Sequence, residues 1–340
     1  VRLVGSEMCI RDSAAAHGGR KIRIMPDGKG VVIMDKLTVD LLKAVSEYVD
    51  GGYTGAFNIR ENGGCAGRQS TDNILIEGKK DGSGLDIYIK AGTKGEKVFI
   101  PACVTRGNVS DLVYNDFHVG AEADVTIIAG CGVHTDDEGE AAHNGIHRFY
   151  LEKGAHVLYE EKHLGTGEGS GQKKIDPVTH VELAEDAVLE MNTIQLGGVD
   201  HSTRTTGGSL ADRAKLLIHE SIMTDGDEYA MTDFDVDMNG EDCAVDLISR
   251  SVAKGNSYQE YHSRIKGNNR CSGHSECDAI LVGKGRVNAA PELYAGHLDA
   301  SLIHEAAIGK VAGEQILKLR TLGLTEEEAE KKIIEGFLKG

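Results

Sequence analysis

Short stretches of strict alternation between apolar and polar residues recur through the middle of the chain. In the run Val181–Leu183, and again at Phe234, Val236 and Met238, every second residue is apolar and a charged residue stands between. A period of two is typical of β-strands that bury one face. The pattern therefore predicts short strands, each with one side turned toward a core.

A weak motif repeats over the same region: a turn with Gly or Glu, then a small, a polar and an aliphatic residue. The small residues are separated by 32, 32, 27, 29 and 42 positions; they are Ala123, Ala155, Ala187, Ala214, Cys243 and Gly285. A period of about 20–50 residues indicates stacked structural units. With the alternation, it predicts a mainly β protein, a parallel β-helix over residues 60–298.

Helical patterns flank this predicted solenoid. Residues 14–59 form a mixed N-terminal segment, in which residues 36–50 carry an amphipathic stripe of leucines and valines. Residues 299–340 are predicted to be helical, with one helix over 301–323 and a second that starts at a Thr325/Glu328 capping box. The apolar stripe of the second helix consists of Ala329, Ile333, Ile334, Phe337 and Leu338.

The first thirteen residues, VRLVGSEMCIRDS, resemble a translated sequencing adapter. We treat residues 1–13 as a non-native segment and leave them out of the fold prediction, as is usual for fusion scars.

Composition narrows the class of protein. The net charge of −17 argues against nucleic-acid binding, which needs a basic face, and against an anionic membrane surface. No apolar run approaches the roughly 18 residues of a membrane span. The 44 glycines and the absence of Trp suit tight turns between short strands. The cysteines after residue 13 are irregularly spaced, which predicts reduced thiols and a cytoplasmic location rather than a disulfide framework.

Two segments contain metal-ligand residue types. The first holds Cys131, His134, His143 and His147 within seventeen residues, a set that suits zinc or iron. The alternative is that these histidines bond to the backbone at coil edges. No catalytic triad and no phosphate-binding loop is visible, so the sequence predicts no enzyme.

The second segment places Cys271, His274 and Cys277 within seven residues. A structural zinc site needs about four ligands, usually as two close pairs, and no second pair stands beside this run. The alternatives for Cys277 are a cluster ligand and a small buried hydrophobe. Cys271 and His274 fit turn residues that assist such a site.

The C-terminal 65 residues carry a specific combination of motifs, beginning with ECDAILVGKGRVNAAPEL and continuing through SLIHEAAIGK to TEEEAEKKIIEGF. This combination resembles the C-terminal signature of the SufB/SufD family, scaffold subunits of the SUF iron–sulfur cluster assembly machinery. The resemblance is looser over residues 115–276. It implies a right-handed parallel β-helix core with helices at the ends, in agreement with the repeat pattern.

The resemblance also implies a site. Cys277 matches the family's cluster cysteine, and His304 and Glu305 match the residues that complete that site around a transient iron–sulfur cluster. Two positions depart from the SufB pattern: Ile303 stands where a Glu is usual, and the strand DFDVDMNG, which looks most like the sulfur-entry strand, has no Cys. One thiolate with His and Glu would hold a cluster weakly enough to release it.

The partners that the resemblance implies are a SufC-type ABC ATPase, bound by the C-terminal helices, and a cysteine desulfurase or sulfur carrier. A homodimer or a SufB/SufD-type heterodimer would form through the last coils. No nucleic acid or membrane is expected. Two other functions remain open on sequence grounds: a β-helix enzyme acting on polysaccharide, and a metal-stabilised binding module using Cys131 and the nearby histidines.

Overall fold

The computed structural model describes residues 22–24, 30–32, 34–49, 52–80 and 82–339. The adapter-like residues 1–13 lie outside the described residues. Two short strands near the N-terminus, β1 (Ile22–Ile24) and β2 (Gly30–Val32), form an antiparallel pair of their own.

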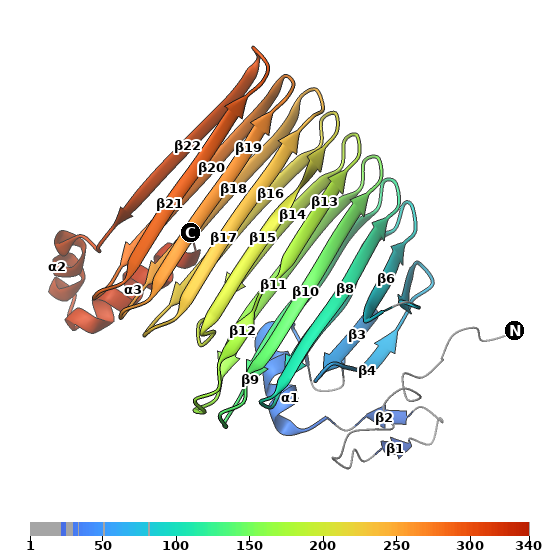
Figure 1. The fold of residues 1–340 in the computed structure, drawn as a ribbon, viewed down its shortest axis with the longest axis horizontal. Helices are drawn as coiled ribbons and strands as arrows, with labels where there is room; N and C mark the ends of the chain where they lie inside the picture. The colour runs from blue at the N-terminus through green and yellow to red at the C-terminus, as the bar shows by residue number, and fades with distance from the viewer. Residues whose placement is uncertain (1–21, 25–29, 33, 50–51, 81, 340) are drawn as a thin grey trace, which may run out of the picture.

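The body of the protein is a β-solenoid with two facing ten-stranded sheets (Figure 1). From β6 onward the chain alternates between the two sheets, with β12 and β13 following each other in the same sheet. Sheet 1 contains β3 (Ala56–Glu61), β4 (Gly64–Gln69), β7 (Lys94–Val104), β9 (Asp124–His134), β11 (His156–Thr166), β14 (Val188–Gln195), β16 (Lys215–Thr224), β18 (Cys243–Ala253), β20 (Cys271–Leu281) and β22 (Ala300–Gly309). Sheet 2 contains β5 (Ile74–Gly78), β6 (Gly84–Ile89), β8 (Val109–Val119), β10 (Ala141–Leu151), β12 (Lys173–Ile175), β13 (Val178–Leu183), β15 (His201–Leu210), β17 (Tyr229–Met238), β19 (Tyr258–Gly267) and β21 (Arg286–Ala295). The predicted parallel β-helix is confirmed.

The repeated small residues mark one corner of the coils. Ala123, Ala155, Ala187 and Ala214 are buried, and each carbonyl accepts from a residue at the start of the strand in the next coil, as it does for His156 N and Ala123 O at 2.7 Å. The prediction is wrong for the last member of the repeat, Gly285, which does not lie at this corner. Cys243 faces Cys271 in register, whereas Gly285 precedes β21 in sheet 2.

Alternation along each strand builds the core between the sheets. Phe117 of β8 and Phe149 of β10 stack in register with ring centroids 4.5 Å apart. On β17, Phe234, Val236 and Met238 are buried as predicted, and the acidic residues between them face outward. The apolar interior therefore follows directly from the period of two.

Helix α1 (Lys36–Val45) covers the outer side of sheet 1, where it contacts β7, β9 and β11. It ends five residues before the predicted helix does. Asp35 caps its start by accepting from Thr38 N at 2.8 Å. The close approach depends on Gly130 of β9, because a Cβ there would lie 2.3 Å from Val45 O.

The C-terminal segment differs from the prediction. Residues 301–323 do not form one helix: β22 comes first, and α2 (Gly313–Thr321) begins only after it. A strand forms here instead of a helix because β22 pairs in register with β20 over its whole length. The solenoid therefore extends to Gly309 rather than to residue 298.

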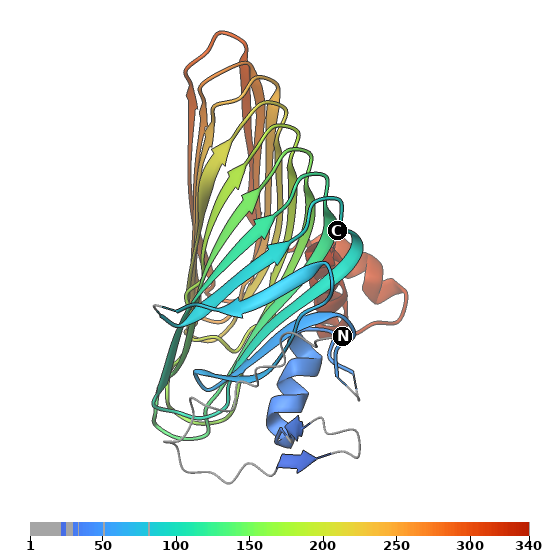
Figure 2. The same ribbon diagram turned by 90° about the vertical axis from the view of Figure 1, so that its right-hand side faces the viewer.

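The last helix, α3 (Glu326–Lys339), lies on the outer face of sheet 1 against β16 and β18. Ser221 Oγ of β16 donates to Leu338 O at 2.9 Å, and Ala329 and Ile334 are buried. Figure 2 shows all three helices on the same side of the solenoid. Among the described residues, no helix is long and apolar enough to cross a membrane.

Candidate functional site

A row of polar side chains runs along the inner face of sheet 1, where an apolar core would otherwise be expected. The members lie at the same register on successive strands and are all buried: Glu161, Thr193, Glu220, Ser249 and Cys277. Because side chains at one register stack directly above one another, the row links the middle of the solenoid to its C-terminal coils.

Cys277 ends this row near the open end of the solenoid. Its side chain is only 2% exposed, and burial, with the nearby carboxylates of Glu220 and Asp278, raises the pKa of the thiol to about 12. The thiol of the lone chain is therefore protonated at neutral pH, and a metal must displace that proton to bind.

His304 lies on the same inner face as Cys277. It faces Ser275 in register, and His304 Nδ1 is 3.2 Å from Ser275 Oγ. Burial lowers the pKa of this half-buried imidazole, which favours the neutral form that binds metals. Glu305 is next along β22, so its side chain points to the outer face, beside Glu276. Cys277 and His304 therefore share the inner face, two register positions apart, and Glu305 lies on the opposite side of the strand.

Cys271 and His274 do not share a face with each other. Cys271 is buried in the core beside Cys243. His274 faces outward on β20, and its Nδ1 lies 2.8 Å from Asp246 Oδ1. The Cys-x2-His-x2-Cys spacing therefore does not gather three ligands at one point.

The histidines of the other predicted segment each have a separate partner. His134 lies 3.1 Å from Asp136 and His143 lies 3.1 Å from Asp111, which also bonds Arg60. His147 Nδ1 lies 2.8 Å from the Tyr159 hydroxyl. Within the part of the chain that the structure describes, these histidines form no common metal-ligand group with Cys131.

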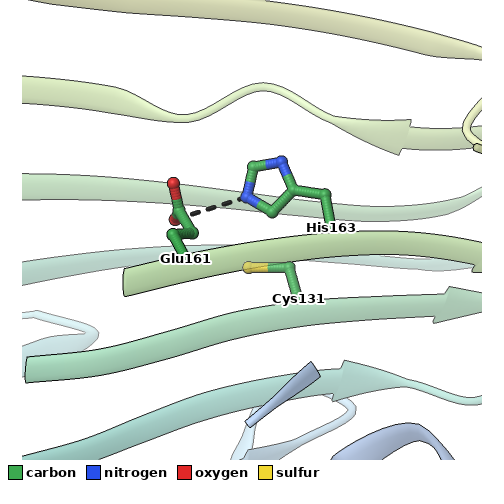
Figure 3. A group of neighbouring side chains, drawn as sticks. All are labelled: Cys131, Glu161 and His163. Carbon is green, nitrogen blue, oxygen red and sulfur yellow. Dashed lines mark ion pairs between the residues drawn. The ribbon is translucent and has the colours of Figure 1, made fainter. Parts of the chain in front are cut away.

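Cys131 instead joins two residues of the next coil, Glu161 and His163, whose ligand atoms all lie within 4.8 Å of one another (Figure 3). Neither Glu161 nor His163 was predicted from the sequence. A signal was present, because His163 follows Cys131 by the same 32 positions that separate Ala123 from Ala155.

A buried charge network surrounds this group. Arg204 of β15 donates to Glu161 Oε2 at 2.7 Å and lies 3.4 Å from Glu220 Oε1. Burial alone would raise the pKa of Glu161. His163 and Arg204 nevertheless hold this pKa well below its usual range. Burial raises the pKa of Glu220, which accepts from Thr232 and Ser249.

The buried His147 predicts a pH dependence of stability. Burial lowers the pKa of His147 from 6.5 to about 4. Between these values the unfolded chain binds a proton that the folded chain does not, so the free energy of unfolding should fall by roughly 3 kcal/mol as the pH drops through this window. In urea titrations at several pH values, His147→Gln should reduce the slope of the free energy of unfolding against pH by the equivalent of about one proton. The exposed His180→Gln should leave it unchanged, and equal slopes for all three proteins would contradict the prediction.

Comparison with known proteins places the solenoid in a family. Residues 107–337 match the model described as "SUF system FeS cluster assembly, SufBD core domain". An "Iron-sulfur cluster assembly SufBD family protein" of Methanothermobacter thermautotrophicus is 28% identical over 278 residues, which cover 80% of this chain and 66% of that protein. One from Archaeoglobus fulgidus is 28% identical over 262 residues, covering 74% and 68%.

A further relative, from Methanocaldococcus jannaschii, is 26% identical over 284 residues, which cover 79% of this chain and 86% of the relative. The chain thus spans about two thirds of the length of the first two relatives named above. The family model covers sheet 1 from β9, sheet 2 from β8 and nearly all of both C-terminal helices. The chain therefore belongs to the SufBD core family of the SUF system, as its C-terminal motifs indicated.

Proposed function

We propose that this protein is a scaffold subunit of iron–sulfur cluster assembly, and that the nascent cluster is its cargo, held at Cys277 and His304. The observation that carries the proposal is the shared inner face of these two side chains in the last coils, next to the open end. The relatives are named as assembly proteins, which favours a scaffold over a polysaccharide-active enzyme.

The ligand set suits temporary binding. One thiolate and one imidazole give a cluster fewer strong ligands than the about four thiolates of permanent sites. Glu305, on the outer face, would complete the site only where the strand edge meets a second chain. Anaerobic reconstitution with iron and sulfide, read by visible absorption, tests the proposal, and a colourless product would contradict it.

A second chain is expected at the open end. Among the described residues, strands β21 and β22 have no neighbour beyond them in their sheets, and this end exposes large apolar side chains: Leu293, Tyr294, Leu298, Ile303 and Ile308. An unpaired, apolar edge is a template for pairing. Pro291 has no backbone N–H group and so interrupts the row of hydrogen-bond donors along β21, whereas β22 contains no proline. We therefore expect a second chain to pair with β22. The partner would be a second copy or a SufD-type subunit.

The C-terminal helices would bind the SufC-type ABC ATPase, with a cysteine desulfurase or sulfur carrier supplying sulfur. The two C-terminal helices differ in how much of their apolar surface is buried against the solenoid. Helix α3 buries its apolar side against sheet 1. Helix α2 has no buried residue, its Leu317 is 61% exposed, and Leu322, directly after the helix, is 75% exposed. We therefore assign the docking surface to α2.

Leu317→Glu should weaken binding of a SufC-type ATPase by about 30-fold or more, because a central apolar anchor contributes about 2 kcal/mol or more to such an interface. The fold should be unchanged, since this side chain contacts solvent. Calorimetric titration with the purified ATPase measures the effect. Leu112→Glu, at an exposed leucine of β8, is the matched control. Equal affinity of the Leu317 variant and the wild type would overturn the assignment.

A further inference from the structure

We propose that the middle of the solenoid contains a second metal site, formed by Cys131, Glu161 and His163, for a single divalent transition-metal ion such as Zn²⁺ or Fe²⁺. The three ligand atoms lie within 4.8 Å of one another, and all three side chains are buried (Figure 3). This set replaces the histidines of the predicted segment and lies apart from the cluster site.

The register of the coils brings the three residues together. Cys131 of β9 stands directly beside His163 of β11. Glu161 precedes His163 by two residues, so both side chains point to the same inner face. Figure 3 shows the Glu161 carboxylate, the His163 ring and the Cys131 sulfur turned toward one another. The ligands are held by paired backbone rather than by loops.

Several buried polar atoms here lack hydrogen-bond partners. Glu161 Oε1 and His163 Nε2 pair with each other at 3.3 Å, and neither makes a well-formed hydrogen bond within the described part of the chain. Thr193 Oγ1 and Gln195 Nε2, at the same registers of the next strand, are also without partners among the described residues. A small cavity lined in part by Thr193, Gln195 and Arg204 lies beside them. Buried polar atoms without partners call for a ligand.

Arg204 leaves room for a cation because it bonds the other carboxylate oxygen, Glu161 Oε2. With Glu220 ionised, the two carboxylates and a Cys131 thiolate carry three negative charges against the single positive charge of Arg204. A divalent ion brings this sum to zero, which a buried site requires.

The protons also balance. In the metal-free chain Arg204 lies 3.4 Å from His163 Nδ1 and can only donate, so Nε2 carries the imidazole proton. When an ion binds Nε2, that proton moves to Nδ1 and the contact with Arg204 opens. The Cys131 thiol loses its proton to solvent as the metal–sulfur bond forms. Binding therefore releases one proton per ion and weakens as the pH falls.

The donor set defines the class of ion. One sulfur, one nitrogen and one oxygen suit borderline-soft ions such as Zn²⁺, Fe²⁺ and Co²⁺, and not Ca²⁺ or Mg²⁺. Three protein ligands leave a fourth position for water or another small ligand. Cys131 and Cys277 lie five strands apart in sheet 1, which is about 24 Å at the usual spacing between strands. The two thiols cannot bind the same ion.

The test uses the full chain produced in minimal medium with added Co²⁺, so that the buried site can load as the chain folds. The expected product carries one cobalt per chain and shows thiolate-to-cobalt charge transfer. Cys131→Ala should abolish the charge transfer, and Glu161→Gln should weaken retention of cobalt against a chelator by more than about tenfold. The retained fraction should fall as the pH is lowered.

Two controls separate this site from other thiols. Cys103→Ala, a buried cysteine outside the group, and Cys277→Ser should both keep the charge transfer. A wild-type chain without cobalt, or charge transfer that survives Cys131→Ala, would overturn the proposal. Because the assay involves neither iron–sulfur reconstitution nor a partner, its failure would leave the scaffold function untouched, and a failed reconstitution would leave this site untouched.

Discussion

Cys277→Ser should abolish the iron–sulfur absorption that the wild-type chain acquires on anaerobic reconstitution. The thiol lies on the inner face of the last paired coils, the face that also carries His304, so a nascent cluster would lose its only thiolate from this chain. Serine has nearly the same shape as cysteine, and its hydroxyl can form hydrogen bonds, so the circular dichroism spectrum should be unchanged. Visible absorption and iron and sulfide content measure the loss.

Cys271→Ser is the matched control for this prediction. Cys271 lies on the same strand and on the same inner face, and is buried to a similar degree, but its neighbour in register is Cys243. It should keep the cluster, as should Cys65→Ser. A variant at Cys277 with the wild-type cluster yield, or equal losses at Cys271 and Cys277, would contradict the proposed site.

Arg204→Met should lower the free energy of unfolding by about 3–5 kcal/mol, because it leaves two buried carboxylates without their cation. Glu161 and Glu220 are each nearly inaccessible to solvent, and Arg204 is the guanidinium that contacts both. Urea denaturation followed by circular dichroism measures the change.

The comparison is with Arg213→Met, which breaks ion pairs to Glu185 and Asp186 at the surface and should change stability by only about 0–1 kcal/mol. Adding Glu161→Gln and Glu220→Gln to Arg204→Met should recover much of the loss, since the uncompensated charges are then gone. Similar free energies of unfolding for the two arginine variants would contradict the prediction, because the buried network would then contribute no more than the surface ion pairs.

The strands could be predicted from the sequence because burial follows alternation. The spacing of Asp235 and Asp237 also fits a calcium loop, yet both lie on the outer face of β17 and pair with Lys266. The apolar residues that alternate with them decided the outcome, because the burial of Phe234 and Val236 stabilises a strand.

The candidate site was harder to predict, for a geometric reason. The expected helix over residues 301–323 gives His304 and Glu305 neighbouring directions, whereas the side chains of a strand point to opposite faces. The Cys131 group escaped attention because its members belong to different coils. Contacts across a solenoid obey the coil period, and a search within seventeen residues cannot find a partner 32 residues away.

The uncovered last coil also has a consequence for how the protein opens. In a solenoid each coil is stabilised chiefly by its neighbours, and the coil of β21 and β22 has a neighbour on one side only. Local unfolding therefore begins at this end and reaches the middle only through successive coils. Amide hydrogens of β22 should exchange with solvent sooner than those of β11 or β14. Their protection would then report directly on whether the edge is occupied.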